Sequence, residues 1–414
     1  MSLLYNISIY SYHLLISVSS LFNEKARLWL KGRKNIFFRL SDIISTKDKF
    51  VWFHAASLGE FEQGRPVIEA FRKKFPQYKI LLTFFSPSGY EIRKDYKGAD
   101  FIFYLPIDTK INARKFIQIV NPRLAFFIKY EFWFNYLNVL YEKNVPVFII
   151  SAIFRKEQHF FKWYGGWFRK MLKKITFFFV QNRNSLEVLD SIGIKNAKIS
   201  GDTRFDRVFA ISQKTQKYPL IAKFTEGKKI FLAGSTWQPD EELIEQLAEK
   251  NKNDIKFIIA PHEVHEERIR SLISRFGKHK VLRYSESDEI NISHADILII
   301  DGIGFLSSLY QYCDVAYIGG GFGKGIHNIL EAATFGKPVI FGPNYFKFQE
   351  AVELISQGGA ICVNNIGELI ENTDKLLKKA DYYRTCSEIC KNYIISKCGA
   401  THIILDNLQK IINT

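Results

Sequence analysis

The sequence predicts an α/β protein of two doubly wound, Rossmann-like domains that face each other across a cleft. From residue 50 onward, short runs of β-branched and aromatic residues alternate with amphipathic stretches. A polar stretch at residues 206–227 interrupts this alternation, which restarts at residue 228. Near-continuous apolar strands with helical crossovers are typical of parallel sheets covered on both faces. A chain of 414 residues has room for two such domains.

The first 23 residues contain no Asp, Glu, Lys or Arg, and they predict a membrane-associated helix. The segment is long enough to cross a bilayer, although Asn, Ser and His residues dilute it. Basic residues follow at Lys25, Arg27, Lys31, Arg33, Lys34 and Arg39. By the positive-inside rule they place the rest of the chain in the cytoplasm. The alternative is a surface helix packed on the first domain.

The first domain is expected over residues 24–205. Its strands are expected at residues 50–55, 79–85, 101–105, 124–130, 145–152 and 177–181, with helices such as 61–74 and 112–120 between them. Residues 154–174 interleave basic and aromatic side chains, a mixture that suits the surface of an anionic bilayer. Two other readings of this stretch are single-stranded nucleic-acid binding and an amphipathic helix with its aromatic side chains in the core.

A linker is expected at residues 206–227 and the second domain at residues 228–380. Its strands are expected at residues 229–233, 255–260, 280–283, 295–300, 315–319 and 338–341. Residues 381–414 are expected to form a helical tail that crosses back onto the first domain.

Composition excludes several classes of protein. The five cysteines form no CxxC pair, so neither a disulfide framework nor a zinc site is expected, and a reduced compartment fits best. The chain has no GxGxxG at the first strand-to-helix turn and no GxxxxGK[ST], so dinucleotide-dependent oxidoreductases and P-loop proteins lose their main support. It also has no HExxH, a motif of catalytic metal sites, and no GxSxG, the nucleophile turn of hydrolases. We therefore expect no bound cofactor and no metal. The net charge of +16 favours polyanionic partners.

Two glutamates follow strands of the first domain, where doubly wound folds bind their ligands. Glu60 comes after the run His54–Gly59 and is expected as a general base, or else as a helix-capping carboxylate. Glu131 lies among aromatic residues and is expected to orient Glu60 or the acceptor, or to be structural with Lys129 or a nearby arginine as its partner.

A glycine-rich segment at residues 319–331 carries the strongest local signal in the second domain. Five glycines in seven residues after a strand predict an anion-binding loop, to which the following helix adds its positive end. The residues expected to bind are Gly320, Gly321, Gly323, Lys324, Gly325 and Asn328, together with Glu331 as an acceptor for a ribose diol. Ser235, Thr236 and His262 follow neighbouring strands and are expected at the same rim.

Several of these segments resemble one known family. They are HAASLGEFEQGRP, SPSGYE, KYEFW, AGST and GGGFGKGIHNILEAATFGKPVIFGPNYFKFQEA. Together they are similar to the 3-deoxy-D-manno-octulosonic acid (Kdo) transferases of lipopolysaccharide synthesis, and the similarity runs to about residue 360. The Ser-x-Gly-Glu turn combined with the glycine-rich loop is fairly specific to that family.

The resemblance implies a glycosyltransferase B-type fold and an inverting, metal-independent transfer. Kdo would move from CMP-Kdo to a hydroxyl of the lipid A precursor, lipid IVA, at the cytoplasmic face of the bacterial inner membrane. Glu60 then matches the family's catalytic base and Glu131 its second functional glutamate, in an acceptor-binding first domain. Ser235, Thr236, the glycines of 320–325, Asn328 and Glu331 match positions that bind the donor nucleotide.

The chain departs from the family at two places. Pro261-His262-Glu263 stands where Pro-Arg-His is common, so His262 or Lys324 would replace the missing arginine. Tyr130-Glu131-Phe132-Trp133 differs from the commoner Glu-Leu-Trp form. An alternative function is a transferase that uses another nucleotide sugar, such as a UDP-sugar, on a membrane lipid. A third is a membrane scaffold without activity. Nucleic acid is not expected as a partner, because the basic clusters coincide with membrane-like segments.

Overall fold

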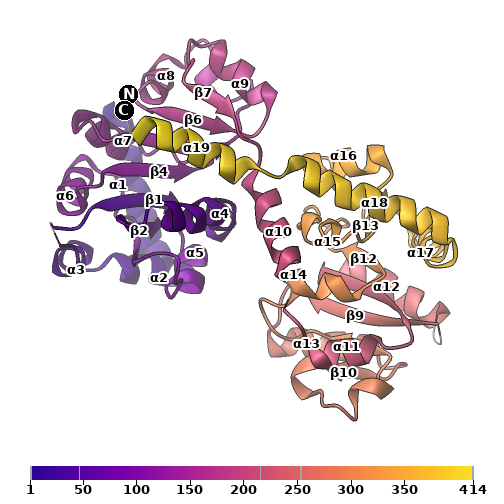
Figure 1. Cartoon of the computed structure of the whole chain (residues 1–414). Coiled ribbons are helices and arrows are strands. Elements are labelled where there is room, and N and C mark those ends of the chain that lie inside the picture. Colours follow the sequence, from indigo (N-terminus) through magenta and orange to yellow (C-terminus); the bar gives the residue numbers. More distant parts are fainter. Residues whose placement is uncertain (1, 46, 215, 252–253, 413–414) are drawn as a thin grey trace. The chain divides into compact units, whose positions relative to one another are not determined.

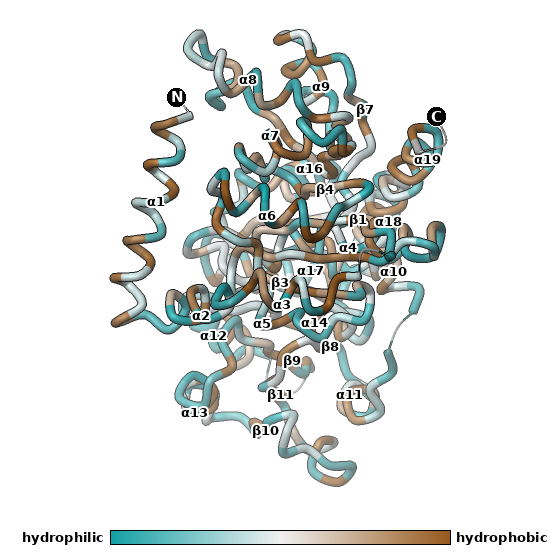
Figure 2. The backbone as a smooth tube through the Cα atoms, turned by 90° about the vertical axis from the view of Figure 1, so that its left-hand side faces the viewer, coloured by the Kyte–Doolittle hydropathy of each residue, from teal (hydrophilic) through white to brown (hydrophobic). Residues whose placement is uncertain are grey.

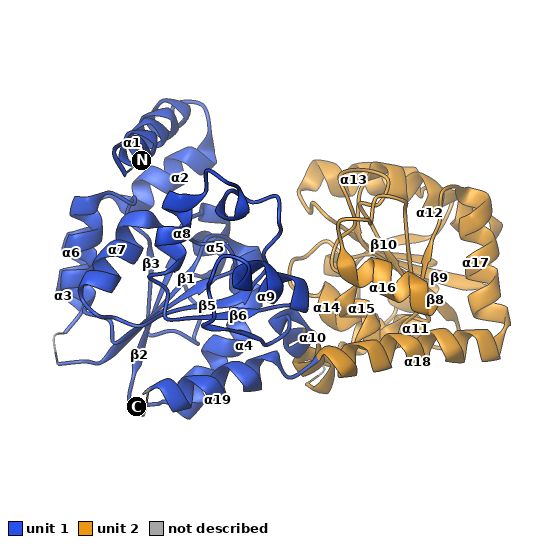
Figure 3. Cartoon of the chain, turned by 90° about the horizontal axis from the view of Figure 1, so that it is seen from above, with its two compact units in different colours: residues 1–207, 398–414 blue, residues 208–397 orange. Residues whose placement is uncertain are grey.

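The computed structural model describes residues 2–45, 47–214, 216–251 and 254–412, and it divides into two compact units (Figure 1 and Figure 3). Unit 1 comprises residues 1–207 and 398–414, and unit 2 comprises residues 208–397. Helix α10 (Thr203–Gln213) runs through the boundary between residues 207 and 208. The expected linker, residues 206–227, therefore contains most of α10 and all of α11 (Pro219–Thr225).

Unit 1 is built on a seven-stranded parallel sheet in the order β3-β2-β1-β4-β5-β6-β7. Its strands are β1 (Phe50–Ala55), β2 (Lys79–Phe84), β3 (Phe101–Tyr104), β4 (Leu124–Ile128), β5 (Val147–Ala152), β6 (Phe177–Val180) and β7 (Ala197–Ile199). Its helices are α1 (Ser2–Ser19), α2 (Glu24–Arg33), α3 (Ile36–Ile43), α4 (Leu58–Lys74), α5 (Pro87–Arg93), α6 (Lys110–Val120), α7 (Phe134–Glu142), α8 (Gly166–Leu172), α9 (Arg183–Asp190) and α19 (Ala400–Ile412).

The continuous apolar character of β1 follows from burial on both faces of this sheet. Phe50 and Trp52 pack into one core, which α3, α6, α7, α8 and α9 complete, whereas Val51 and Phe53 pack into the other. Helix α4 covers the second core, and α19 adds Ile404 and Leu408 to it. Because both faces are covered, the run shows no polar alternation.

Unit 2 repeats the same architecture with the strand order β10-β11-β9-β8-β12-β13-β14. Its strands are β8 (Lys229–Thr236), β9 (Ile255–Pro261), β10 (Val281–Arg283), β11 (Ile297–Ile299), β12 (Val315–Ile318), β13 (Val339–Phe341) and β14 (Ala360–Cys362). Besides α11, its helices are α12 (Gln238–Lys250), α13 (Glu266–Arg275), α14 (Leu306–Leu309), α15 (Leu330–Ala333), α16 (Gln349–Gln357), α17 (Ile366–Lys378) and α18 (Ala380–Lys397).

The predicted fold class of two parallel α/β sheets is confirmed. All twelve predicted strands are present at nearly the predicted residues. The sequence analysis missed β7 and β14, which have three residues each and lie at the edges of their sheets. Edge strands this short do not form the long buried runs on which such predictions depend.

Helix α1 contacts the rest of unit 1 through aromatic and polar side chains, with Tyr5 against Phe134 and Tyr12 against Trp29. None of its residues is buried, and Leu3, Leu4, Leu14 and Leu15 are each more than 60% exposed. Figure 2 shows the mixture of hydrophobic and polar residues along this helix. Tyr5 donates a hydrogen bond of 2.6 Å to Asp108 Oδ2. Over the described residues, the structure contains no helix with the length and apolar character needed to span a bilayer.

The basic aromatic stretch at residues 154–174 divides its side chains between the core and the surface. Phe154 is buried, and Phe160, Phe161 and Phe168 pack against the core of unit 1. Trp163, in contrast, is 91% exposed.

Candidate functional site

Glu60 lies in the first turn of α4, immediately after β1 at the carboxyl end of the unit 1 sheet. The side chain is half-buried, and the Ser57 hydroxyl donates a hydrogen bond to its Oε2. Ser57 is the N-cap residue of α4, with extended backbone angles. The short turn between strand and helix therefore places the carboxylate at the strand end, where its orientation is set by a neighbouring hydroxyl.

Charged side chains of both signs act on Tyr130 at the same strand ends. Burial raises the pKa of the Tyr130 phenol, Arg155 and Arg204 lower it, and Glu60 and Asp202 raise it further. Arg204 forms an ion pair with Asp202, with 2.7 Å between Nη2 and Oδ2. Sequence analysis assigned no site role to Arg155 or Arg204. Arg155 follows β5 by three residues, so the rule that ligands bind at strand ends would have found it.

Glu131 belongs to a network of aromatic and imidazole groups. Trp133 Nε1 donates to Glu131 Oε2 at 2.8 Å and lies 3.1 Å from His54 Nε2, and His54 Nε2 is 3.5 Å from Glu131 Oε2. On the other side of the ring, His54 Nδ1 lies 2.8 Å from the buried Thr83 hydroxyl. The single N–H of Trp133 is thus directed at both Glu131 Oε2 and His54 Nε2. Lys129 or a nearby arginine was the expected partner of Glu131, whereas the contacts here come from Trp133 and a fully buried histidine, which the sequence analysis had not assigned to it.

The glycine-rich loop of unit 2 follows β12 and lies against two other strand ends. A Cβ atom on Gly321 would lie 2.5 Å from the backbone nitrogen of Gly342, so only glycine fits there. Gly320 and Gly325 have φ angles of +92° and +133°, a region that favours glycine. The N–H groups of Gly323 and Gly325 both donate to Gly320 O. The loop therefore folds back on itself and uses these two donors internally.

Asp240 in α12 fixes the start of this loop. It accepts hydrogen bonds from Gly320 N at 2.9 Å, Trp237 N at 2.9 Å and the Tyr317 hydroxyl at 2.8 Å. Burial raises the pKa of this carboxyl group, while the three donors oppose that rise. The sequence analysis did not single out Asp240, because two of its three partners, Tyr317 and Gly320, lie about eighty positions further along the chain.

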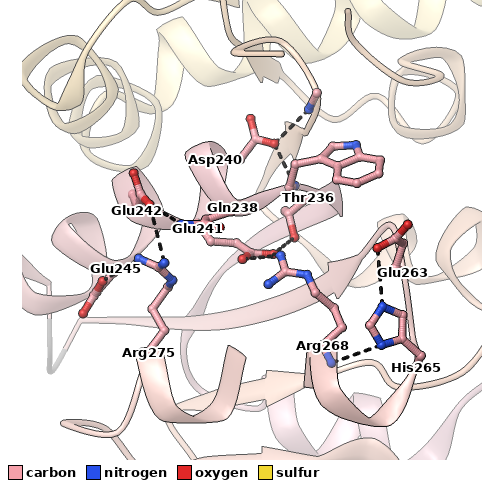
Figure 4. A network of polar contacts seen from close by, with 12 residues as sticks. Thr236, Gln238, Asp240, Glu241, Glu242, Glu245, Glu263, His265, Arg268 and Arg275 are labelled. Atoms are coloured by element: carbon pink, nitrogen blue, oxygen red, sulfur yellow. Dashed lines mark hydrogen bonds and ion pairs between the residues drawn. The ribbon is translucent and has the colours of Figure 1, made fainter. Parts of the chain in front are cut away.

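Thr236 is committed to a second buried carboxylate. Its hydroxyl donates to Glu241 Oε1 at 2.8 Å, and the Arg268 guanidinium forms an ion pair with the same carboxylate (Figure 4). Glu241 is fully buried and Arg268 is 14% exposed. The Thr236 side chain is therefore buried and bonded to Glu241, and it has a supporting role at the end of β8. Its neighbour Ser235 is half-exposed and has a left-handed φ of +55°.

Three rings stack beside the glycine-rich loop. The His262 ring lies 4.6 Å from that of Trp237 and 4.4 Å from that of His327, with interplanar angles below 30°. Burial, together with the neighbouring His262, lowers the pKa of His327 to about 4. His327 is therefore a neutral imidazole at pH 7, and Trp237 Nε1 donates to its Nε2 at 3.2 Å.

The end of the glycine-rich segment orients Glu331. Asn328 Nδ2 donates to Glu331 Oε1 at 3.1 Å, and Asn328 Oδ1 accepts from Leu330 N at 3.2 Å. The helix after the loop, α15, spans only Leu330–Ala333, so its dipole at the amino-terminal end is weak. Lys324 is exposed. Among the described residues, no three His, Cys, Asp or Glu side chains are grouped as metal ligands would be.

Comparison with known proteins yields one family. A family model described as 3-deoxy-D-manno-octulosonic-acid transferase (kdotransferase) matches residues 31–207. The transferase of that name from Rickettsia typhi is 28% identical over 364 residues, which cover 86% of this chain and 77% of the relative. The one from Haemophilus influenzae is 25% identical over 370 residues, covering 87% and 86% of the two chains.

Solved structures share the fold. UDP-GlcNAc 2-epimerase from Neisseria meningitidis, bound to UDP-GlcNAc, superimposes with a TM-score of 0.62 at 18% identity, covering 87% of this chain and 100% of the epimerase. HepE from Anabaena, in complex with UDP-glucose, superimposes with a TM-score of 0.54 at 12% identity. The match covers 88% of this chain and 100% of HepE. At these identities the likeness concerns the fold alone. The comparisons lead to one conclusion: residues 31–207 match the 3-deoxy-D-manno-octulosonic-acid transferase family model, and the chain is similar along most of its length to transferases of that name.

Proposed function

We propose that this protein is an inverting glycosyltransferase that moves Kdo from CMP-Kdo to a hydroxyl group of the lipid A precursor. The similarity of the chain to 3-deoxy-D-manno-octulosonic acid transferases supports the reaction. The observation that carries the mechanism is the position of Glu60, half-buried at the end of β1 and oriented by Ser57.

Glu60 acts as the general base in this proposal. Its carboxylate takes the proton of the acceptor hydroxyl while that oxygen attacks the anomeric carbon of Kdo. The bond from this carbon to the CMP phosphate breaks, and CMP leaves with the bonding electrons. Arg155, which acts on Tyr130 together with Glu60, provides positive charge on the acceptor side, whereas Arg204 is paired with Asp202.

Glu131 has a positioning role in the same unit. Trp133 and His54 hold its carboxylate from two directions, and Thr83 fixes the far side of the His54 ring. A carboxylate held in this way keeps one orientation when the acceptor binds. We assign it to orienting the acceptor sugar, while Glu60 takes the proton.

Unit 2 binds the nucleotide of the donor. Ser235 lies at the carboxyl end of β8, and His262 and Lys324 follow β9 and β12; all three are half-exposed or exposed and can contact the phosphate. The closely packed glycines 320, 321, 323 and 325 let the backbone approach the ligand, and Thr236 supports this loop. Asn328 holds Glu331 for bidentate contact with the ribose diol. We propose that these groups stabilise the leaving phosphate without a metal ion.

The protein works at the cytoplasmic face of the membrane in this proposal. Helix α1 exposes several leucines, and α2 and α3 carry basic residues directly after it. An apolar surface next to cationic side chains suits an anionic bilayer that contains the lipid acceptor.

The test is transfer of labelled Kdo from CMP-Kdo, generated in situ, to a tetraacylated lipid A precursor. Wild type and Glu60→Gln are compared without added metal and with a chelator. We expect wild type to be active under both conditions, and kcat of the variant to fall by roughly 10²–10⁴-fold. Binding of CMP should be unchanged, since Glu60 lies in unit 1.

Glu69→Gln is the matched control, because Glu69 lies on the same helix and pairs with Arg65 instead. It should retain wild-type transfer. Full activity of Glu60→Gln would show that Glu60 is not the general base. Loss of transfer in the presence of the chelator would show that the reaction needs a metal ion. Preferential binding of UDP over CMP would move the assignment to a different nucleotide sugar.

A further inference from the structure

Unit 1 contains a cavity that the proposed chemistry does not use. It has a volume of about 430 Å³ and lies where β3 ends, between the α2–α3 turn, the start of α6 and one side of α1. Pro106 and Ile107, which directly follow β3, form part of its wall. Because all strands of this sheet are parallel, the cavity opens at the same sheet edge as Glu60 and Glu131.

The cavity is cationic. Arg33 and Lys115 line it together with His13, and no Asp or Glu is among its described lining residues. The Arg33 guanidinium donates to Leu105 O at 2.8 Å, Trp29 O at 3.0 Å and Phe85 O at 2.7 Å, all of them neutral acceptors. It also lies over the Trp29 ring, 3.7 Å from the ring centre.

Burial lowers the pKa of Arg33 to about 9, so this side chain is still a cation at neutral pH. Its closest electrostatic neighbours are the phenols of Tyr104, Tyr136 and Tyr12 rather than carboxylates. A partly desolvated cation whose described partners are all neutral is best balanced by an anion.

The rest of the wall is apolar or amide. Ile36 and Phe37 line the cavity, and Phe38 beside them is 72% exposed. Lys115 Nζ stands 4.9 Å from the centre of the Phe37 ring, which places a charge directly against an aromatic surface. Asn35 and Asn112 add amide groups. A ligand that is complementary to both the cationic and the apolar parts of this cavity carries an anionic group and hydrocarbon on the same molecule.

A short chain of contacts connects the cavity to the proposed acceptor site. The peptide oxygen of Phe85 accepts from Arg33, and the Phe85 ring lies 4.7 Å from the Trp133 ring. Trp133 in turn donates to Glu131. A lipid held in the cavity therefore has its polar part next to the residues that orient the acceptor.

We propose that this cavity, lined by Arg33, Lys115, Asn112 and Phe37, is a subsite for a phosphate group of the glycolipid acceptor, with adjoining hydrocarbon against Phe37 and Phe38. The inference rests on the proposed function, because it takes the lipid acceptor from it. It goes further by naming the chemical group that is recognised and the side chains that recognise it.

Lys115→Gln is the decisive variant, because Lys115 is exposed on α6 and its loss should leave the fold intact. With the phosphorylated acceptor, KM for the lipid should rise roughly tenfold, while kcat and KM for CMP-Kdo stay unchanged. With the same lipid after removal of its phosphates, the variant and wild type should have equal KM values. Arg114→Gln, which removes the same charge from the neighbouring position outside the cavity, should behave as wild type.

Binding without turnover separates this inference from the proposed function. Full-length wild type, Lys115→Gln and Arg33→Gln are passed over nanodiscs that contain the phosphorylated or the dephosphorylated lipid, in the absence of CMP-Kdo. Selective, Lys115-dependent binding of the phosphorylated lipid supports the subsite even if no Kdo is transferred. Inorganic phosphate at equal concentration should not displace the lipid.

Three results would overturn the subsite. The first is an equal effect of Lys115→Gln on both lipids, and the second is an equal effect of Arg114→Gln, which would indicate general attraction to the membrane. The third is displacement by inorganic phosphate as efficient as displacement by the lipid, which would indicate a free-anion site. Arg33→Gln is interpreted only if its circular dichroism matches wild type, since Arg33 also holds three backbone carbonyls.

Discussion

At the scale of single residues, the partner of each carboxylate decides what it can do. Glu60 contacts a serine hydroxyl and is half-buried, an environment that fits the general base proposed above. Glu131 contacts Trp133 and His54. Glu241 is fully buried and paired with Arg268. The same side-chain type thus has three different environments in one chain.

The buried ion pair of Glu241 predicts a large stability effect. Arg268→Ala would leave a fully buried carboxylate without its cation, and we expect unit 2 to lose about 3–5 kcal/mol of unfolding free energy. Arg270→Ala on the same helix removes an exposed pair with Glu266 and should lose less than about 1 kcal/mol. Urea unfolding followed by circular dichroism measures both, and equal losses would contradict the structural role.

Asp108 predicts a pH dependence of stability in unit 1. Burial raises the pKa of this carboxyl group to about 6 from its usual 3.8, despite hydrogen bonds from Tyr5, Asn135 and Tyr136 that favour the ionised form. Between these two values the folded state binds more protons than the unfolded state. The unfolding free energy should therefore fall as the pH rises from about 4 to 6, by roughly 3 kcal/mol from this group.

Asp108→Asn should remove this contribution and flatten the profile. Five of the six tryptophans lie in unit 1, so urea unfolding followed by tryptophan fluorescence reports mainly on this unit. An unchanged slope between pH 4 and 6 in the variant would show that Asp108 is not responsible.

At the scale of elements, loops after the strands are held in place by packing against other loops. The glycine-rich loop after β12 contacts the segment after β13 at Gly321 and Gly342, and Asp240 of α12 holds Gly320. The close approach of two backbones excludes any side chain at this point. Glycine density in the sequence is therefore explained by packing as well as by a ligand.

Two neighbouring glycines provide a matched test of this packing. In Gly321→Ala the new methyl group would lie 2.5 Å from Gly342 N and 2.6 Å from its Cα, so the two loops must separate. We expect CMP affinity to fall by roughly tenfold or more, with a loss of about 1–3 kcal/mol of stability. In Gly323→Ala the nearest atom is Gly320 O at 3.6 Å, and near-normal CMP binding is expected. Calorimetric titration with CMP measures both, and unchanged affinity in Gly321→Ala would contradict the argument.

At the scale of the whole molecule, we expect the net charge of +16 and the exposed leucines of α1 to act together in the proposed membrane binding. Replacing both Leu14 and Leu15 by Glu should lower the affinity for vesicles with anionic lipid more than tenfold, because two apolar side chains no longer insert. The control, Ile290→Glu with Ile303→Glu, changes two similarly exposed residues of unit 2 and should have little effect. Co-sedimentation at low and high salt measures this, and an equal effect of both pairs would indicate charge alone.

Much of the candidate site could be predicted because strand ends and family motifs are local patterns. Glu60, Glu131, Ser235 and the glycines were found in this way, and their roles stay predictions until the variants above are measured. His54, Asp240 and the pair Arg155 and Arg204 were not assigned. Each acts on a residue distant in the sequence, as Asp240 does on Gly320 eighty positions away.

The amino-acid sequence by itself determined the two parallel α/β units of this protein and its similarity to the Kdo transferases. A strand buried on both faces is an unbroken apolar run of a few residues, and a strand-to-helix turn is shorter still, so both are visible without a structure. Only the tertiary structure decided how Tyr5 docks on Asp108, how Arg33 comes to line a cavity, and which groups hold Glu131. These contacts join distant parts of the chain, and they form only when whole helices and strands have packed together.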